Sequence, residues 1–303
     1  MRAIDLHTHT CKSDGSYTPT ELVDYAIEKD LAAVAITDHD SIEGLDEAVA
    51  HAAALKERGL PSMEVIPGIE FSTKYEKQDV HIVGLYISYN KEDFRNALRN
   101  FVNSRVNRNI KMCKNLQKAG IDITYEKLQA AYPDAVITRA HYASYLLAHG
   151  YVKSRQDAFS EYLGDHTKYF VPREKVTPSQ AVNLILQAGG VPVLAHPPLY
   201  HMGNDRLESL VSFLKADGLM GIEAFYSTYS NQDVRDMQRL AKKYDLLLSG
   251  GSDFHGANKP GLDLGCGYGR LYVPEEVLFK IKAALPGASQ ANHHGSDTAS
   301  QDT

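Results

Sequence analysis

Short apolar runs alternate with amphipathic stretches in residues 1–90 and again in the last third of the chain. The apolar runs predict strands at 3–6, 31–36, 63–71, 80–86, 191–195, 221–225 and 246–250. Apolar positions that recur every three or four residues predict helices from 19 onward, from 42 to 58, and at 181–188, 207–214 and 232–243. This alternation is typical of parallel strands joined by crossover helices, so we expect an α/β fold. Strand 80–86 is an exception, because His81 opens it, so its direction differs and a short hairpin-like connection can bring His81 beside Glu70.

The first two of these helices carry clear end signals. Thr18 is a good N-cap, Pro19 suits the first helical position, and Glu21 stands three residues after the cap. Gly59 follows the second helix, and glycine ends helices because it adopts a left-handed backbone without steric cost.

The middle of the chain breaks this rhythm. His196 comes 115 positions after His81, whereas one β-α unit needs only about 30 residues. Helical periodicity fills the gap, at 91–119, 124–131, 138–149 and 154–163. We expect a barrel built from residues 1–90 and 176–285, with a helical insertion over 91–175 that covers its mouth. The alternative is a set of extra barrel helices without strands. The tail, residues 286–303, lacks periodicity and is expected to be disordered.

Composition narrows the class of partner. The chain has 303 residues, of which 43% are hydrophobic, enough for one large core with an insertion. Its net charge of −6 provides no positive field for long polyanions, so a nucleic-acid partner is expected to be short. No apolar run reaches the roughly 18 residues of a membrane span, and no signal peptide is evident. Three widely spaced cysteines favour the reducing cytoplasm over a disulfide framework, and no obligate protein partner is evident.

Histidines and carboxylates stand at the ends of the predicted strands. His7 and His9 follow the first strand two residues apart, so both imidazoles face the same side. Asp253 and His255 repeat that spacing after the last strand. Each block alone has an ordinary explanation, such as a turn or a helix cap. The set as a whole comprises His7, His9, Asp14, His39, Glu70, His81, His196, Asp253 and His255.

This set predicts a metal cluster, because strand ends of an α/β barrel converge on one point. A catalytic ion keeps about three protein ligands, so the set suggests two or three divalent ions, with Glu70 and Asp253 as bridges. Mixed imidazole and carboxylate ligands suit manganese, iron or zinc. Asp38 and Asp40 flank His39 and are expected to support the ligands, for instance by fixing a histidine tautomer. Among the predicted strands, 221–225 is the one without such a residue at its end.

The same blocks resemble the PHP (polymerase and histidinol phosphatase) family of phosphoesterases. The likeness covers His7-x-His9, Ser13-Asp14-Gly15, Thr37-Asp38-His39, Gly68-Ile69-Glu70, His81, His196-Pro197 and Gly251-Ser252-Asp253-Phe254-His255, in order and across nearly the whole chain. The resemblance implies a distorted (β/α)7 TIM-like barrel with a trinuclear metal site, and a metal-dependent phosphoric ester hydrolase.

Within that family the chain resembles stand-alone bacterial enzymes with a helical insertion. Those enzymes release phosphate from nucleoside 3′,5′-bisphosphates or, in the RNase AM type, trim short RNA from the 5′ end. The likeness rests on Thr138-Arg139-Ala140-His141 and on Thr167-Lys168-Tyr169-Phe170-Val171-Pro172, and it implies that Arg139 and Lys168 bind the substrate phosphate. The chain departs from the pattern at Pro198, where glycine is frequent, and around Lys168, where Gly-Lys-Pro is frequent. Both departures concern substrate-facing loops.

We therefore expect a metal-bridging hydroxide to attack phosphorus in a nucleotide or short oligonucleotide, while Arg139 and Lys168 offset the developing charge. His196 and His255 are the candidate acids for the leaving alcohol, and the sequence does not decide between them. The alternative activity is a histidinol-phosphate phosphatase or another hydrolase of small phosphate esters. A non-catalytic metal-binding module is the second alternative.

The remaining candidates are open or structural. The stripe Arg105, Arg108, Lys111, Lys114 and Lys118 lies on one helix face, and a solvated surface is favoured over a path for an RNA backbone. Tyr162, Tyr169 and Phe170 fit base stacking and core packing equally well. The glycine-rich stretch 261–269 is expected to be a flexible loop of the active site, and Cys11 an incidental turn residue.

Overall fold

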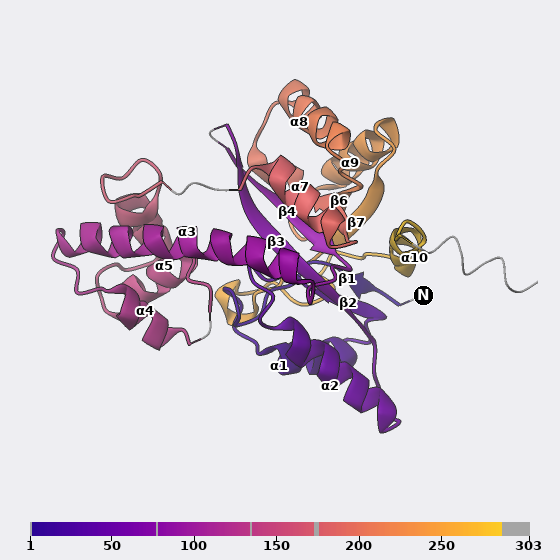
Figure 1. Ribbon diagram of the computed structural model, residues 1–303, viewed down its shortest axis with the longest axis horizontal. Helices are drawn as coiled ribbons and strands as arrows, with labels where there is room; N and C mark the ends of the chain where they lie inside the picture. The colour runs from indigo at the N-terminus through magenta and orange to yellow at the C-terminus, as the bar shows by residue number, and fades with distance from the viewer. Residues whose placement is uncertain (1, 77, 134, 173–175, 287–303) are drawn as a thin grey trace, which may run out of the picture.

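The computed structural model describes residues 2–76, 78–133, 135–172 and 176–286, and shows a barrel with a helical lobe beside it (Figure 1). The barrel is a seven-stranded sheet in the order β1-β2-β3-β4-β5-β6-β7. Its strands are β1 (Ile4–Asp5), β2 (Ala33–Ile36), β3 (Glu64–Tyr75), β4 (Gln78–Leu85), β5 (Val191–Leu194), β6 (Gly221–Tyr226) and β7 (Leu247–Gly251). A bridge between Thr8 and Phe254 brings the two edges together just beyond β1 and β7, so the sheet nearly closes. The expected distorted barrel is confirmed.

Strand β4 runs against both of its neighbours. The pairs β1–β2, β2–β3, β5–β6 and β6–β7 are parallel, whereas β4 is antiparallel to β3 and to β5. Strand β4 thus departs from the parallel pattern, and its antiparallel pairing with β3 confirms the different direction expected for the strand that His81 opens. The hairpin register pairs Ser72 with His81, which brings His81 to within two residues of Glu70 on the neighbouring strand.

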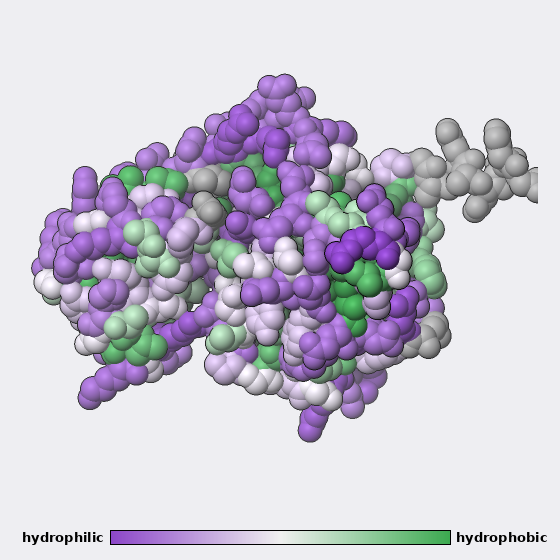
Figure 2. Space-filling view, turned by 90° about the horizontal axis from the view of Figure 1, so that it is seen from below, coloured by the Kyte–Doolittle hydropathy of each residue, from purple (hydrophilic) through white to green (hydrophobic). Residues whose placement is uncertain are grey.

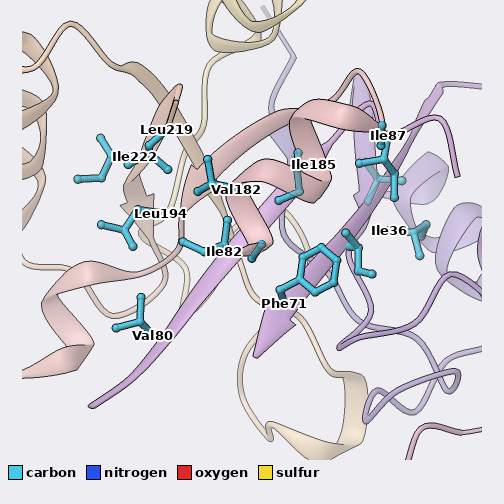
Figure 3. Close-up of a cluster of buried hydrophobic side chains, with 14 of the residues drawn as sticks. Ile36, Phe71, Val80, Ile82, Ile87, Val182, Ile185, Leu194, Leu219 and Ile222 are labelled. Carbon is cyan, nitrogen blue, oxygen red and sulfur yellow. The ribbon is translucent and has the colours of Figure 1, made fainter. Parts of the chain in front are cut away.

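Five helices cover the outside of the sheet and a sixth packs against its inner face. The covering helices are α1 (Pro19–Glu28), α2 (Leu45–Glu57), α7 (Pro178–Gln187), α8 (Asn204–Ala216) and α9 (Asn231–Lys243), and the sixth is α10 (Glu275–Ala283). In Figure 3, Val182 and Ile185 of α7 lie against Ile82 of β4, within one buried cluster. A second buried cluster contains Ile66 of β3, Val83 of β4 and side chains of α10. Ile66 and Val83 lie on the same strand faces as Glu70 and His81.

The predicted N-cap of α1 and the predicted C-terminal end of α2 are confirmed, although α2 begins at Leu45 and not at residue 42. Thr18 caps α1 and forms a capping box with Glu21, and Gly59 after α2 has φ of +67°. Helix α7 begins at Pro178, earlier than predicted, because Thr177 caps it in a second capping box.

The lobe consists of α3 (Glu92–Gln117), α4 (Tyr125–Ala131), α5 (Arg139–Ala148), α6 (Arg155–Ala158) and a π-helical turn (Phe159–Leu163). Met112, Tyr142 and Leu146 belong to a hydrophobic cluster made only of lobe residues. Helix α3 extends from the barrel into this lobe (Figure 1), and Phe94 near its start packs in the barrel core. The four predicted helical segments are confirmed, the last one being divided between α6 and the π turn.

The glycine-rich stretch 261–269 is hydrogen-bonded to α1 and β1, near the seam where the β1 and β7 edges of the barrel meet. Asp263 accepts hydrogen bonds from the Tyr25 hydroxyl and the Lys29 ammonium of α1, both at 2.6 Å. The Gly265 amide donates to Asp5 of β1 at 2.9 Å. Gly267 has φ of +56° and lies against Ser227, where a Cβ would come within 2.5 Å of the hydroxyl oxygen. This stretch is thus a bonded strap over β1 and α1, which differs from the flexible active-site loop that we expected.

One face of the molecule is mainly hydrophilic. On the face seen in Figure 2, hydrophobic side chains form small separate patches among polar ones. Within the described ranges, no helix has both the length and the apolar character required to cross a membrane. The predicted disordered tail falls, from residue 287 on, outside the described residues.

Candidate metal centre

All nine predicted side chains meet at one end of the barrel, around Glu70. Five histidine nitrogens surround its carboxylate: His7 Nε2 and His9 Nε2 at 3.2 Å, His39 Nδ1 at 3.1 Å, His81 Nδ1 at 2.8 Å and His196 Nε2 at 3.1 Å. Glu70 is 1% exposed, so water does not screen this carboxylate. A buried carboxylate at the centre of five imidazoles has the geometry of a shared metal ligand.

Asp14 and Asp253 occupy the other side of the cluster. Asp14 Oδ1 lies 3.2 Å from His255 Nε2, and Asp253 Oδ1 lies 3.3 Å from His9 Nε2. Four groups of side chains have ligand atoms close enough to hold one ion each: His9, Asp14, His39 and His255; His7, Glu70 and His196; His7, His9 and Asp253; His39, Glu70 and His81. Glu70 belongs to two groups, as a bridging ligand would, whereas Asp253 belongs to one.

Backbone pairing at the seam fixes the first and last of these residues. The Asp253 amide donates to the His7 carbonyl at 2.8 Å, and the His9 amide donates to the Phe254 carbonyl at 2.9 Å. Two of the nine residues adopt left-handed backbone conformations, His196 with φ of +32° and Asp253 with φ of +57°. Such conformations are costly for non-glycine residues and persist where the surroundings hold them, as at functional sites.

Glu223 of β6 is a site residue that the sequence analysis missed. Its carboxylate lies 3.1 Å from His7 Nδ1 and accepts the His196 amide proton at 2.7 Å. A glutamate within a buried apolar run carries the same desolvation cost that singled out Glu70, so the signal was present. Strand 221–225 indeed has no such residue at its end, but it carries Glu223 within it, where the strand-end pattern does not apply.

Other side chains hold the ligands in place from outside the cluster. The Tyr226 hydroxyl donates to Asp253 Oδ2 at 2.6 Å, and the Lys259 ammonium contacts the same oxygen. His255 Nδ1 lies 2.8 Å from the Asp253 carbonyl oxygen, which directs His255 Nε2 toward Asp14. These bonds select one tautomer and one orientation of the His255 ring.

Asp38 and Asp40 support the site less directly than expected. Asp38 accepts hydrogen bonds from the Thr10 amide and hydroxyl, at 2.8 Å and 2.7 Å, and from the Ser13 hydroxyl at 2.5 Å. Ser13 in turn lies 3.4 Å from His9 Nδ1, so Asp38 reaches a histidine only through Ser13. Asp40 accepts from the Ser72 amide at 3.1 Å and contacts Arg105.

Burial and neighbouring charges act against each other on the groups of the cluster. Burial opposes ionisation of Glu70, but His39, His7 and His81 outweigh it and hold the pKa of this carboxyl well below its ordinary value. Burial likewise disfavours charge on His9, yet Asp253 and Glu70 raise the pKa of this imidazole to about 9. Burial lowers the pKa of His255, which keeps that ring neutral and able to bind a metal.

The donor atoms fit divalent ions. His7 Nε2, His9 Nε2 and Asp14 Oδ1 are buried without a hydrogen-bond partner among the described residues. Buried polar atoms are nearly always satisfied, and each of these three side chains belongs to a candidate ion group. Imidazole nitrogens and carboxylate oxygens, without thiolates, suit borderline and hard divalent metals. Cations held by these groups would satisfy the three atoms.

A cavity of about 300 Å³ opens beside the cluster, between barrel and lobe. Asp14, His39 and His81 line it from the barrel, and Arg105, Arg108 and Arg139 line it from the lobe. Arg139 Nη2 lies 3.2 Å from Asp79, its other terminal nitrogen contacts Asp165, and its guanidinium stacks on Phe170 at 5.5 Å. The cavity therefore joins ligand groups of the cluster to three guanidinium groups.

The cationic stripe on α3 divides into two parts. Arg105 is 5% exposed and Arg108 is half-buried, both at the cavity, whereas Lys111, Lys114 and Lys118 are exposed. The prediction of a solvated helix face is therefore wrong for the two arginines. Lys168 is also exposed, outside the cavity lining, with its ammonium 5.0 Å above the Tyr169 ring.

Among the aromatic candidates, Tyr162 and Tyr169 stack on each other with ring centres 5.5 Å apart. His196 and His255, the candidate leaving-group acids, are both buried within the cluster. His81 is more accessible, with 23% of its side chain exposed.

Comparison with known proteins agrees with this geometry. The chain is 35% identical over 266 residues to a 3′,5′-nucleoside bisphosphate phosphatase of Chromobacterium violaceum, covering 88% of this chain and 91% of that relative. It is 38% identical to a 5′-3′ exoribonuclease of Haemophilus influenzae, covering 83% of this chain and 89% of the relative. A crystal structure of a metal-dependent phosphoesterase from Bifidobacterium adolescentis superposes with a TM-score of 0.78 at 30% identity, covering 93% of this chain and 96% of the other. The PHP domain matches residues 5–176, and the chain belongs to the PHP domain family.

Proposed function

We propose that this protein is a metal-dependent phosphoesterase that releases phosphate from nucleoside 3′,5′-bisphosphates and trims short RNA from the 5′ end. The observation that carries the proposal is the cavity in which Asp14, His39 and His81 face Arg105 and Arg139. Metal ligands opposite guanidinium groups suit a substrate that carries phosphate. The relatives in Chromobacterium violaceum and Haemophilus influenzae, a nucleotide phosphatase and an exoribonuclease, support this choice of substrate class.

The nine clustered side chains would hold two or three divalent ions, of manganese, iron or zinc, with Glu70 shared between two of them. Such ions supply an activated water at neutral pH and neutralise charge on the phosphoryl oxygens. Arg139 would orient the phosphate with its planar fork, in the position that Phe170 gives it. Lys168 would add a second cation by approaching the substrate from its exposed position. Of the two candidate acids, His196 would give a proton to the leaving oxygen, because the His255 ring is neutral and its two nitrogens face the Asp253 carbonyl and Asp14.

The lobe, residues 91–175, would cover the site and limit the size of the substrate. A cavity of about 300 Å³ is at the lower end of the range of small-molecule sites, so it suits one nucleotide and excludes folded nucleic acid. A longer RNA would enter by its end.

The proposal is tested by phosphate release from metal-loaded protein, with adenosine 3′,5′-bisphosphate, a 5′-phosphorylated RNA trinucleotide and histidinol phosphate as substrates. We expect kcat/KM to be at least ten times higher for the bisphosphate than for histidinol phosphate, and mononucleotides to appear from the RNA. A preference for histidinol phosphate would select the alternative phosphatase. Metal binding without release of phosphate from any of the three esters would select the non-catalytic module.

A further inference from the structure

Helix α6 of the lobe binds the barrel beside the metal centre. Arg155, the first residue of α6, donates two hydrogen bonds to Asn258: Nη1 to the carbonyl oxygen and Nη2 to Oδ1, both at 2.8 Å. Asn258 ends the short helical turn Gly256–Asn258, three residues after His255. Two parallel bonds from one guanidinium fix both the position and the orientation of Asn258.

Asn258 passes this constraint to Asp14. Its side-chain amide, the half not used by Arg155, donates to the Asp14 carbonyl oxygen at 2.9 Å. The Asp14 carboxylate lies 3.2 Å from His255 Nε2, and the Ser16 amide donates to the His255 carbonyl at 3.1 Å. Asn258 therefore links the two segments that carry Asp14 and His255, which belong to the same candidate ion group.

The lobe also holds the Asp14 segment from a second direction. The Val136 amide donates to the Lys12 carbonyl at 3.2 Å, and the Thr138 hydroxyl donates to Asp14 Oδ2 at 3.3 Å. The ion group of His7, Glu70 and His196 differs, because Glu223 of β6 holds both of its histidines within the barrel. One ion group thus depends on the lobe and another on the strands.

We propose that Arg155 and Asn258 are positioning residues, through which the docked lobe sets the geometry of the ion held by His9, Asp14, His39 and His255. The inference rests on the proposed metal-dependent function. A residue that orients a metal ligand from outside contributes about 10- to 100-fold in metal affinity. Loss of the Arg155–Asn258–Asp14 connection should therefore weaken this one ion, while the ions held by the strands remain.

Three variants separate the connection from simple docking of the lobe. Arg155→Ala removes the clamp, and Arg155→Lys keeps the charge but loses the paired bonds. Asn258→Asp retains both acceptors for Arg155, and so keeps the lobe docked, but loses the N–H that Asp14 accepts. It also adds negative charge, which would by itself attract cations, so any loss of metal from this variant follows from the lost bond. Arg206→Ala is the matched control, because Arg206 forms an exposed bond of 2.6 Å to Glu76.

The measurements are bound manganese per chain after gel filtration, by elemental analysis, and the Kd of the weakest ion by manganese titration. We expect Arg155→Ala and Asn258→Asp to lose about one ion per chain and to raise that Kd about 10- to 100-fold, with Arg155→Lys between them and the wild type. Excess manganese should restore their turnover, and Arg206→Ala should match the wild type.

Unchanged metal content and Kd in Asn258→Asp would overturn the inference and leave docking as the role of Arg155. Loss of every ion together would also overturn it, because the ion group would not be separate. A wild-type protein that binds no manganese would instead refute the proposed function itself.

Discussion

Asp14 connects the two halves of the site, because it faces the histidines of the barrel and also lines the cavity under the lobe. Burial disfavours its charge, yet His39, His255 and His9 together hold the pKa of this carboxyl well below its ordinary value. A carboxylate kept ionised at this position serves to bind cations. Its substitution should affect metal and turnover more than folding.

For Asp14→Asn we expect an intact fold, fewer bound ions and a kcat lowered about 100-fold or more, because the amide keeps the shape but loses the charge. Elemental analysis and phosphate-release kinetics on the same preparation measure both effects, with circular dichroism as the check on folding. Near-normal turnover with full metal content would remove Asp14 from the site.

Glu223 provides a second test at the scale of one residue, because it is not among the described residues that line the cavity and it acts through His7 and His196. Glu223→Gln replaces one acceptor oxygen by an NH₂ group that faces a donor, so one histidine loses its orientation. We expect metal affinity to fall about 10- to 100-fold while turnover at saturating manganese recovers. Manganese titration measures this, with the exposed Glu208→Gln as control; equal Kd values in both variants would contradict the role given to Glu223.

At the scale of elements, local patterns predict what each segment is, and long-range contacts decide how segments meet. Apolar runs and caps located the strands, the start of α1 and the C-terminal end of α2, because these signals lie within a few residues. The direction of β4 could be expected from His81 at the start of its strand, whereas the fixed position of 261–269 depends on contacts with β1 and α1, which no local window contains. Glu223 was not predicted because it stands within β6, whereas the pattern of histidines and carboxylates concerned strand ends.

The β1–β7 seam yields a prediction about stability. Asp5 of β1 accepts the Ser252 amide at 2.8 Å, the Gly265 amide at 2.9 Å and the His7 amide at 3.3 Å. Asp5→Ala leaves these three buried donors without their acceptor, so we expect the free energy of unfolding to fall by about 2–4 kcal/mol. Urea denaturation of metal-saturated protein measures the change, with the exposed Asp205→Ala as control. A loss no greater than that of the control would show that the seam does not depend on Asp5.

At the scale of the whole molecule, the lobe turns an open cluster of ligands into a pocket. Helical periodicity placed Arg105 and Lys114 on one face, but it could not show that α3 begins over the barrel and ends in the lobe. Arg105 is therefore buried at the junction of barrel and lobe while Lys114 is exposed, although the periodic pattern places both on the same helix face. The same junction brings Arg139 and Phe170 to the metal centre, although neither belongs to the barrel.

We expect Arg139 of the lobe to act on the substrate together with the metal centre of the barrel. Arg139→Ala removes the guanidinium fork and leaves the carboxylates of Asp79 and Asp165 at the cavity, where they repel phosphate. We expect kcat/KM for a nucleoside 3′,5′-bisphosphate to fall about 10- to 100-fold, with a smaller loss in Arg139→Lys, which keeps the charge without the fork. Steady-state kinetics at saturating manganese test this, and Arg206→Ala should behave as wild type. If Arg139→Ala kept its full kcat/KM, the phosphate would have to be bound elsewhere in the cavity, and the neighbouring Arg105 and Arg108 would be the next residues to substitute.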